Sequence, residues 1–541
     1  MSTVSRRNFF GGAAGVSATA LSGMAFSGIT TQSGRADTVA PAANRRPNFI
    51  FFMPDELRAD ALSCYGNPVC KTPNLDRLAS QGTKFSQCHV SYPVCGASRC
   101  SLLTGWPASV RGHRSLYYFL RSHEPNLFRY LKNSGYDVYW YGKNDALAAE
   151  SFPDSVTEWN YFPWETRPPR FAAHPNPYNL GDPMYYSFLY NEGGDRRQTA
   201  DYHNLQAAIR ILERKESDRP FCIFLPLSYP HPPYAAPQGF HDLYNPDSLP
   251  PLRSIGLPRK PEFHAGIRKA YGIQALSEKT FRKIRAVYLG MVSYTDWLAG
   301  ELAEAIDRTG HSGDTALFVF SDHGDYGGDY GLVEKWPSGL EDCLTHVPLI
   351  ARVPGGAAGH TSGEIVELFD VMATSLALAG IQAQHTHFAR NLLPQIQGQP
   401  GDANRAAFAE GGYNIYEPQC FEPSRDAAEI YHAKCNLEQT DPETVSRAAM
   451  VRTQTHKLIL RPNGQSELYA YDADPNELHN LYGESSAARV QHELERRLAM
   501  WYVNTTGIAP FDKDQRNAPP FYPVPTFDLS NWQAELLDKT R

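Results

Sequence analysis

The sequence predicts an α/β protein in which helices sandwich a large mixed, mostly parallel sheet, followed by a smaller C-terminal antiparallel-sheet α+β subdomain. Nearly continuous apolar runs, typical of strands buried on both faces, alternate with helical segments up to residue 400. Beyond residue 400 the strands become shorter and are joined by turns such as Arg461-Pro462-Asn463-Gly464. The change of pattern predicts two different sheets in one chain.

The hydrophobic pattern places the elements in order. Strands are expected at 48–53, 136–141, 220–228 and 315–320 and within 343–353, and helices at 72–79, 124–134, 200–214, 277–309 and 367–379. The C-terminal part is expected to contain strands at 406–410, 448–452, 456–460 and 467–471 and a helix at 486–503. Segments 152–195 and 240–272 are rich in proline and aromatic residues without a clear period, so we expect loops there that determine specificity.

The N-terminus predicts an export signal. Ser5-Arg6-Arg7-Asn8-Phe9-Phe10 is a twin-arginine pattern, and a Gly-, Ala- and Ser-rich run continues to Ile29. This run is too short and too rich in glycine for a stable transmembrane helix. We expect residues 1–36 to be a cleaved signal peptide, recognised by the twin-arginine export machinery, and the mature protein to be periplasmic or secreted.

Composition divides the rest of the chain into four parts. These are a linker at 37–46, an α/β domain at 47–400, an α+β subdomain at 401–504, and a tail at 505–541 that is expected to wrap the surface. The formal net charge is −7, which argues against a nucleic-acid partner because such proteins present a basic surface.

Cys95 is the first candidate for chemistry. The chain has nine cysteines, and an odd number in an exported protein suggests one thiol with a separate role. If Cys95 begins the helix-like run that follows it, its side chain lies at the positive end of that helix, with Arg99 one turn further on. This pair suits attack on a tetrahedral oxyanion such as sulfate or phosphate. The alternative is a buried free cysteine with no chemical role.

Two strand ends carry candidate metal ligands. Asp55 and Glu56 follow the strand at 48–53, and Asp322 and His323 follow the strand at 315–320. If both strands are central, these side chains converge, and clustered carboxylates need a cation. Oxygen-rich coordination favours Ca²⁺ or Mg²⁺. For any one of these residues alone, a cap or turn role is the alternative.

Four basic residues are candidates for binding the oxyanion and protonating the leaving group. Arg99 lies on the expected helix, and the others follow strands or lie in loops: Lys143, His231 and Lys335. A leaving alkoxide or phenoxide benefits from a proton donor, and a cation stabilises the charge on the non-bridging oxygens. His231 and Lys335 are the candidates for donor and clamp, although each could equally be a structural or surface residue.

With these residues in place, the chain resembles the type I, formylglycine-dependent sulfatases of the alkaline phosphatase-like superfamily. Their signature C-x-[P/A]-S-R, followed by an apolar run and T-G, is present from Cys95 to Gly105. The resemblance covers roughly residues 46–500 and includes, in order, Arg46-Pro47-Asn48, Thr72-Pro73-Asn74-Leu75-Asp76, Gly142-Lys143, Ser321-Asp322-His323-Gly324, Lys335-Trp336, Val347-Pro348-Leu349-Ile350, Glu467-Leu468-Tyr469 and Asp474-Pro475. It implies that 47–400 is the catalytic domain.

The resemblance implies that a maturation enzyme oxidises Cys95 to Cα-formylglycine, whose hydrate supplies the attacking hydroxyl. It also implies that residue 95 binds one Ca²⁺ (Mg²⁺ is less expected) together with Asp55, Asp322 and His323, with Glu56 in the position of a further acidic ligand. Arg99 and Lys143 would then hold the hydrate and the sulfate, while His231 and Lys335 would contact the sulfate and the leaving oxygen.

The chain departs from the family pattern at three positions. Glu56 stands where Asp or Gln is commoner, and Ala97 stands where Pro is usual. Asp145 occupies the position of a histidine that is thought to act as the base releasing sulfate. Either Asp145 takes that role, or another histidine such as His113 does, or the role does not transfer.

The resemblance implies a sulfuric ester hydrolase (EC 3.1.6.-). The substrate would be a sulfated carbohydrate, choline sulfate or an aryl sulfate, and export together with many loop aromatics favours carbohydrate. The alternatives are a formylglycine-dependent phosphonate monoester or phosphodiester hydrolase, and a protein that binds sulfated glycans without hydrolysing them.

Overall fold

The computed structural model describes residues 46–160, 175–214, 218–510 and 516. The predicted signal peptide, all of the linker except Arg46 and most of the predicted tail at 505–541 lie outside the described residues, as does part of the loop expected at 152–195.

The larger sheet has the strand order β4-β3-β5-β1-β6-β7-β2-β8, with β9 also paired to β2. Strands β4, β3, β5, β1 and β6 run parallel, whereas β7 runs antiparallel to both of its neighbours. The predicted mixed, mostly parallel sheet is therefore confirmed. Its strands are β1 (Asn48–Met53), β2 (Thr83–His89), β3 (Asp137–Trp140), β4 (Glu158–Trp159), β5 (Phe221–Pro226), β6 (Thr315–Phe320), β7 (His346–Arg352), β8 (His360–Ser362) and β9 (Val366–Glu367).

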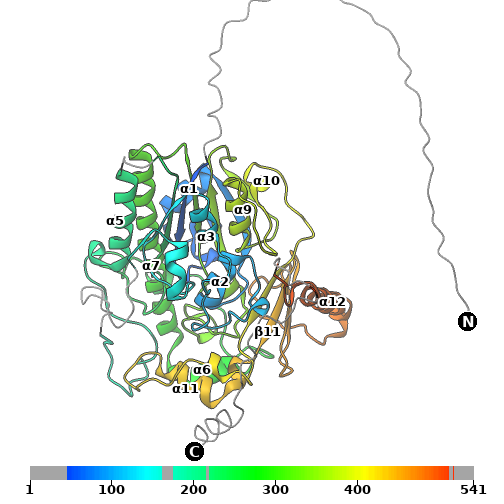
Figure 1. Ribbon diagram of the computed structural model, residues 1–541. Helices are drawn as coiled ribbons and strands as arrows, with labels where there is room; N and C mark the ends of the chain where they lie inside the picture. The colour runs from blue at the N-terminus through cyan, green and yellow to red at the C-terminus, as the bar shows by residue number, and fades with distance from the viewer. Residues whose placement is uncertain (1–45, 161–174, 215–217, 511–515, 517–541) are drawn as a thin grey trace, which may run out of the picture. The chain divides into compact units, whose positions relative to one another are not determined.

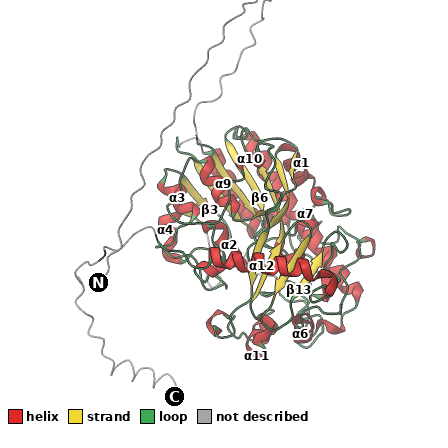
Figure 2. Ribbon diagram, turned by 90° about the vertical axis from the view of Figure 1, so that its right-hand side faces the viewer, coloured by secondary structure: helices red, strands yellow, loops and turns green. Residues whose placement is uncertain are grey.

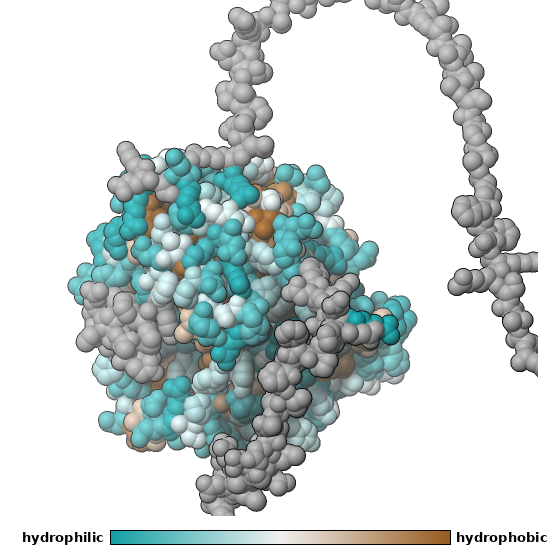
Figure 3. Space-filling view, in the orientation of Figure 1, coloured by the Kyte–Doolittle hydropathy of each residue, from teal (hydrophilic) through white to brown (hydrophobic). Residues whose placement is uncertain are grey.

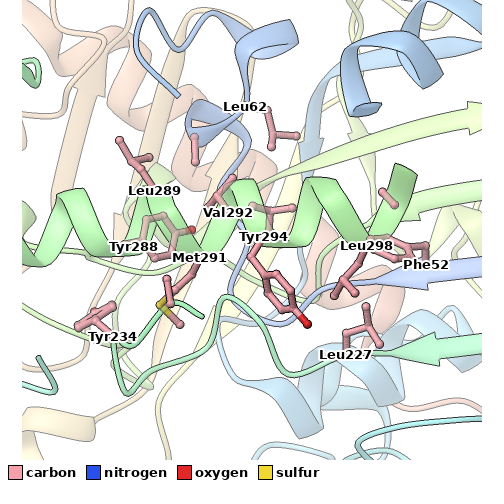
Figure 4. Packing of buried hydrophobic residues seen from close by; sticks show 14 of the residues in the cluster. Phe52, Leu62, Leu227, Tyr234, Tyr288, Leu289, Met291, Val292, Tyr294 and Leu298 are labelled. Atoms are coloured by element: carbon pink, nitrogen blue, oxygen red, sulfur yellow. The ribbon is translucent and has the colours of Figure 1, made fainter. Parts of the chain in front are cut away.

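Helices cover both faces of this sheet (Figures 1 and 2). Because β1 is buried on both faces, its side chains alternate between two cores: Ile50 and Phe52 join one, and Phe49 and Phe51 join the other. Figure 4 shows residues of α7 packed in the first core, close to Phe52. The helices on the two faces are α1 (Pro73–Gln81), α5 (Ala200–Glu213) and α7 (Glu278–Arg308) on one, and α2 (Cys95–Thr104), α3 (Leu127–Asn133) and α9 (Asp370–Leu378) on the other.

A second sheet of four antiparallel strands follows, in the order β10-β11-β12-β13, as predicted. Helix α12 (Ala488–Thr505) covers one of its faces (Figure 2), where Trp501 stacks on Phe408 at 5.0 Å. The other face packs on Leu340 of the larger region. The strands are β10 (Ala407–Gly411), β11 (Ala448–Arg452), β12 (His456–Leu460) and β13 (Glu467–Ala470), and the remaining helices are α4 (Phe152–Ser155), α6 (Phe263–Ala270), α8 (Asp342–Thr345), α10 (Leu393–Ile396) and α11 (His432–Thr440).

The structure contains several short elements that were not predicted, among them α4 and β4 at the start of the predicted loop 152–195. Three further differences have a clear physical reason. Strand β2 was not predicted because its residues, TKFSQCH, form no continuous apolar run, and its place depends on pairing with β7 and β8. The segment 240–272, predicted as loop, contains α6, which begins two residues after Pro261, where a proline does not oppose a helix. Helix α3 starts later than predicted, after Asn126, whose side chain accepts the Arg129 N–H and caps the helix.

The surface and the cysteines complete the description. The face shown in Figure 3 is predominantly hydrophilic, with separate small hydrophobic patches. Among the described residues, no helix combines the length and the apolar character needed to cross a membrane. All nine cysteines are free thiols, and eight of them are buried.

Candidate active site

The carboxyl ends of the adjacent central strands β1 and β6 form the floor of the candidate site. Phe52 pairs with Val319 in register, so the residues that follow the two strands emerge side by side. Cys95 is the first residue of α2, and Ser98 on this helix donates a hydrogen bond to the Asp322 carbonyl at 2.6 Å. The expected convergence of the strand-end acids beside Cys95 is confirmed.

Arg99 connects the two aspartates. Its side chain is fully buried, with Nη2 3.0 Å from Asp55 Oδ2 and Nε 2.8 Å from Asp322 Oδ2. Lys143 Nζ lies 2.5 Å from the same Asp55 oxygen. Burial alone would raise the pKa of Asp55, but Lys143 and Arg99 hold that pKa well below its ordinary value. Asp55 is therefore a carboxylate that turns one oxygen to the cations and the other, Oδ1, to Cys95 and His323.

Four buried residues fit a divalent cation. One ligand atom from each of Asp55, Cys95, Asp322 and His323 lies within 4.8 Å of all the others. His323 Nδ1 lies 2.9 Å from the Gly324 carbonyl, to which it donates, and its Nε2 faces Cys95 Sγ at 3.1 Å. An imidazole nitrogen held in this way and two carboxylates form a donor set suited to a metal ion.

Lys143 enters the site from the turn after β3. Gly142 makes this turn with φ 136°, and a Cβ atom there would lie 2.2 Å from the Pro226 carbonyl oxygen, so the close approach requires glycine. The Lys143 N–H donates to the same carbonyl at 2.8 Å. Its Nζ then lies 3.6 Å from Cys95 Sγ and 3.1 Å from Asp145 Oδ2. Asp145 is thus one side chain away from Cys95.

His231 and Lys335 lie side by side next to Cys95 and Asp55. Asp201 on α5 holds the loop that leads to His231 by accepting the N–H groups of Ser228 and Tyr229. His231 Nδ1 lies 2.6 Å from the Pro232 carbonyl, and its Nε2 lies 3.3 Å from Lys335 Nζ. Burial, together with Lys335 and Lys143, lowers the pKa of His231 well below its ordinary value, so the histidine is neutral and accepts from the Lys335 ammonium.

Glu56 contacts His231 and Lys335 and lies outside the four-residue cluster. Its Oε1 is 2.5 Å from Lys335 Nζ and 3.1 Å from His231 Nε2. Its ligand atom groups with those of Asp55, Cys95 and His231, in a second set of possible ligands. Its backbone φ of 64° is unusual for a residue other than glycine, and Tyr288 on α7 donates to its carbonyl at 2.7 Å. The role of Glu56 as a metal ligand stays a prediction.

His113 lies elsewhere. Its Nδ1 contacts the Tyr118 carbonyl at 2.6 Å and its Nε2 contacts Glu124 at 3.1 Å. The segment that follows it packs over Gly96, where a Cβ atom would lie 2.8 Å from the Ser115 carbonyl oxygen. The structure therefore places Asp145, and not His113, beside the cations of the site.

Glu334 was missed by sequence reasoning. Its Oε1 lies 2.7 Å from Lys335 Nζ, and its side chain is fully buried. No motif marks this residue, since a glutamate next to a lysine is usually a solvated surface pair. Its position beside Lys335 depends on the path of the loop after β6.

Comparison with known proteins agrees with this geometry. The sulfatase family profile matches residues 47–381, which is more than half of the chain. The chain belongs to the sulfatase family. It is therefore a sulfuric ester hydrolase, as the sequence predicted, and the profile of the C-terminal region of N-sulphoglucosamine sulphohydrolase matches residues 428–503.

Individual sulfatases and related structures are similar over most of the chain. Human iduronate 2-sulfatase is 27% identical over 418 residues, which cover 66% of this chain and 74% of the human protein. N-acetylglucosamine-6-O-sulfatase of Bacteroides thetaiotaomicron is 24% identical over a region that covers 84% of this chain and 86% of that protein. The fold is shared with phosphonate monoester hydrolase of Agrobacterium radiobacter, with a TM-score of 0.69 and 21% identity over 85% of this chain and 96% of that one.

Proposed function

We propose that this protein hydrolyses a sulfate ester of a carbohydrate with residue 95 in the formylglycine form and with a bound Ca²⁺. The observation that carries the proposal is the position of Cys95, whose Sγ lies 3.1 Å from His323 Nε2 and 3.6 Å from both Asp55 Oδ1 and Lys143 Nζ. Burial, reinforced by Asp55, raises the pKa of the Cys95 thiol well above its ordinary value, so a thiolate nucleophile is disfavoured. A modified residue at this position avoids that difficulty.

Each side chain around residue 95 has a separate role in the proposed reaction. When present, the hydrated formylglycine supplies the attacking hydroxyl and the divalent cation stabilises its negative charge. Arg99 and Lys143 orient residue 95 and the sulfate, and Lys335 offsets charge on the sulfate oxygens. The negative charge of a bound ester raises the pKa of His231 again, because it favours the protonated imidazole. His231 can then carry a proton at Nε2 and pass it to the leaving oxygen.

The metal can be tested on the chain itself. We expect Ca²⁺ to raise the thermal unfolding midpoint of the purified protein and a chelator to reverse the shift, because a ligand that binds only the folded state stabilises it. The Asp322→Ala variant should show no such shift. Titrations with Mg²⁺ and Mn²⁺ identify the preferred ion, since the His323 nitrogen also suits softer cations. An equal Ca²⁺ response in the wild type and the variant would contradict the assignment of Asp322.

Asp145 is proposed as the base that releases sulfate, because it lies 3.1 Å from Lys143 Nζ. We expect the Asp145→Asn variant to release one equivalent of alcohol per site in a burst and then to turn over about 10²–10⁴-fold more slowly than the wild type. Stopped-flow assays with an aryl sulfate measure both phases. The His113→Gln variant is the control and should show no burst. A burst in the control alone would move the role to His113.

The names of similar proteins support a carbohydrate substrate. The relatives include proteins named iduronate 2-sulfatase and N-acetylglucosamine-6-O-sulfatase, and the C-terminal profile carries the name N-sulphoglucosamine sulphohydrolase. A panel of sulfated mono- and oligosaccharides tested against the matured protein, with Cys95→Ala as the blank, should identify the substrate. Turnover of aryl or choline sulfate with no turnover of any sulfated sugar would refute the carbohydrate proposal.

The same residues can act on phosphorus, and the shared fold with a phosphonate monoester hydrolase makes this the second candidate. Paired assays with an aryl sulfate and an aryl phosphonate separate the two. A higher kcat/KM for the phosphonate would favour the second candidate. Binding of sulfated sugars without turnover of either ester would indicate a binding protein.

We also propose that a formylglycine-generating enzyme matures Cys95 and that the twin-arginine machinery exports the protein to the periplasm or beyond. The motif around Arg6 and Arg7 supports the second point. Replacement of both arginines by lysine should retain the protein in the cytoplasm, as fractionation would show.

A further inference from the structure

Lys335 is held by carboxylates on two sides. Its Nζ lies 2.5 Å from Glu56 Oε1 and 2.7 Å from Glu334 Oε1, and its side chain is 3% exposed. A lysine ammonium on a flexible stem has no preferred direction of its own, so these carboxylates determine where the charge lies. If Glu334 had no other cation beside it, it would draw the ammonium away from Glu56 and His231.

Glu334 is itself fixed by the surrounding backbone. Its N–H donates to Tyr234 Oη at 2.7 Å, its carbonyl accepts the Tyr326 N–H at 2.9 Å, and its φ is 61°. These hydrogen bonds hold the backbone of Glu334, and its Oε1 also lies 3.5 Å from Lys434 Nζ. Glu334 thus stands between two buried lysines.

Lys434 comes from α11, about 100 residues further along the chain. Its Nζ lies 3.0 Å from Glu422 Oε1, and its side chain is 2% exposed. The Glu422 N–H donates at 2.8 Å to Glu438, which lies one turn after Lys434 on α11. These contacts place Lys434 of the C-terminal region against Glu334.

We propose that Lys434 is a positioning residue that acts through Glu334 on Lys335. By neutralising part of the Glu334 charge, Lys434 leaves the Lys335 ammonium directed at Glu56, His231 and the bound sulfate. The inference rests on the proposed function, because Lys335 acts there on the sulfate. The C-terminal region would then contribute to catalysis through the buried charges of Lys434, Glu334 and Lys335.

The test compares two buried lysines of the C-terminal region. Lys434→Met removes the proposed positioning residue, and Lys457→Met removes a matched lysine that lies 2.9 Å from Asp342 and 2.6 Å from Glu477. Both variants should lose thermal stability. Only Lys434→Met should lower kcat for the matured protein, by about 10–100-fold, and Lys434→Arg should recover part of the loss. Equal kcat losses in Lys434→Met and Lys457→Met would overturn the proposal.

A second comparison tests the path of the effect. In a Lys335→Ala background, Lys434→Met should change kcat by less than about twofold, because the effects of substitutions along one chain of contacts are not additive. A further loss as large as in the wild-type background would overturn the path through Lys335. The isosteric Glu334→Gln variant offers the same comparison if Lys434→Met does not fold.

Binding of inorganic sulfate to the unmodified chain, measured by calorimetry, separates this inference from the proposed function. We expect Lys434→Met to weaken the binding of sulfate about tenfold and Lys457→Met to leave the affinity for sulfate unchanged. If the wild type hydrolyses no sulfate ester, the proposed function fails, and this comparison still decides the role of Lys434. Unchanged sulfate affinity in Lys434→Met would overturn it.

Discussion

The Cys95→Ala variant is expected to lose sulfate ester turnover by at least about 10⁴-fold and to remain folded. Alanine lacks the thiol group that the maturation step oxidises, so neither the aldehyde nor its attacking hydroxyl can form, while the cations that bind the sulfate stay in place. The measurement is kcat/KM with an aryl sulfate, together with mass spectrometry of the peptide that contains residue 95. The wild-type peptide should have the mass of the aldehyde.

The matched control for this variant is Cys100→Ala. Cys100 is buried on the same helix, and its Sγ lies 3.5 Å from the Ala146 carbonyl, away from the strand-end acids. We expect both variants to lose about 1 kcal/mol of unfolding free energy and only Cys95→Ala to lose activity. Retention of more than a few per cent of activity in Cys95→Ala, or an unmodified thiol in active wild-type protein, would remove the formylglycine proposal.

The Arg99→Ala variant is expected to lower the unfolding free energy by about 3–5 kcal/mol and to abolish turnover. Arg99 bridges Asp55 and Asp322, and all three side chains are fully buried, so its removal leaves acidic charge without its partner. Arg99→Lys should restore little, because one ammonium cannot reproduce the two-sided contact of a guanidinium. Urea unfolding of the metal-free protein measures the loss.

The control for Arg99 is a surface pair. Arg121 lies 3.2 Å from Glu150, and the two side chains are 56% and 47% exposed. Arg121→Ala should change the unfolding free energy by less than about 1 kcal/mol. A loss below about 1 kcal/mol in Arg99→Ala would show that the two aspartates do not depend on this guanidinium.

Much of the site follows from short stretches of sequence. The buried strands that precede Asp55 and Asp322 are continuous apolar runs, and acids that follow such strands point to the ligand-binding edge of a sheet. Cys95 and Arg99 lie one turn apart on one helix, so their proximity is local. These residues were predictable because the pattern that identifies each spans only a few positions.

Other features depend on pairings across the chain. Strand β2 lacks an apolar run, and its pairing with β7 and β8 places it in the sheet. Helix α6 was not predicted because its segment is rich in proline. Asp145 lies beside Lys143, whereas His113 contacts Glu124. These positions depend on the paths of two loops, which cannot be predicted from the spacing of residues in the sequence.

The sequence by itself determined the sheet type, the residues at the two central strand ends and the place of Cys95 at the start of a helix, because hydrophobic period and helical spacing are properties of short segments. Only the tertiary structure decided that Glu56 faces Lys335 and His231, and that Lys434 reaches Glu334 across about 100 residues. Buried charges are stable only beside compensating partners, and long-range packing alone determines which partners meet.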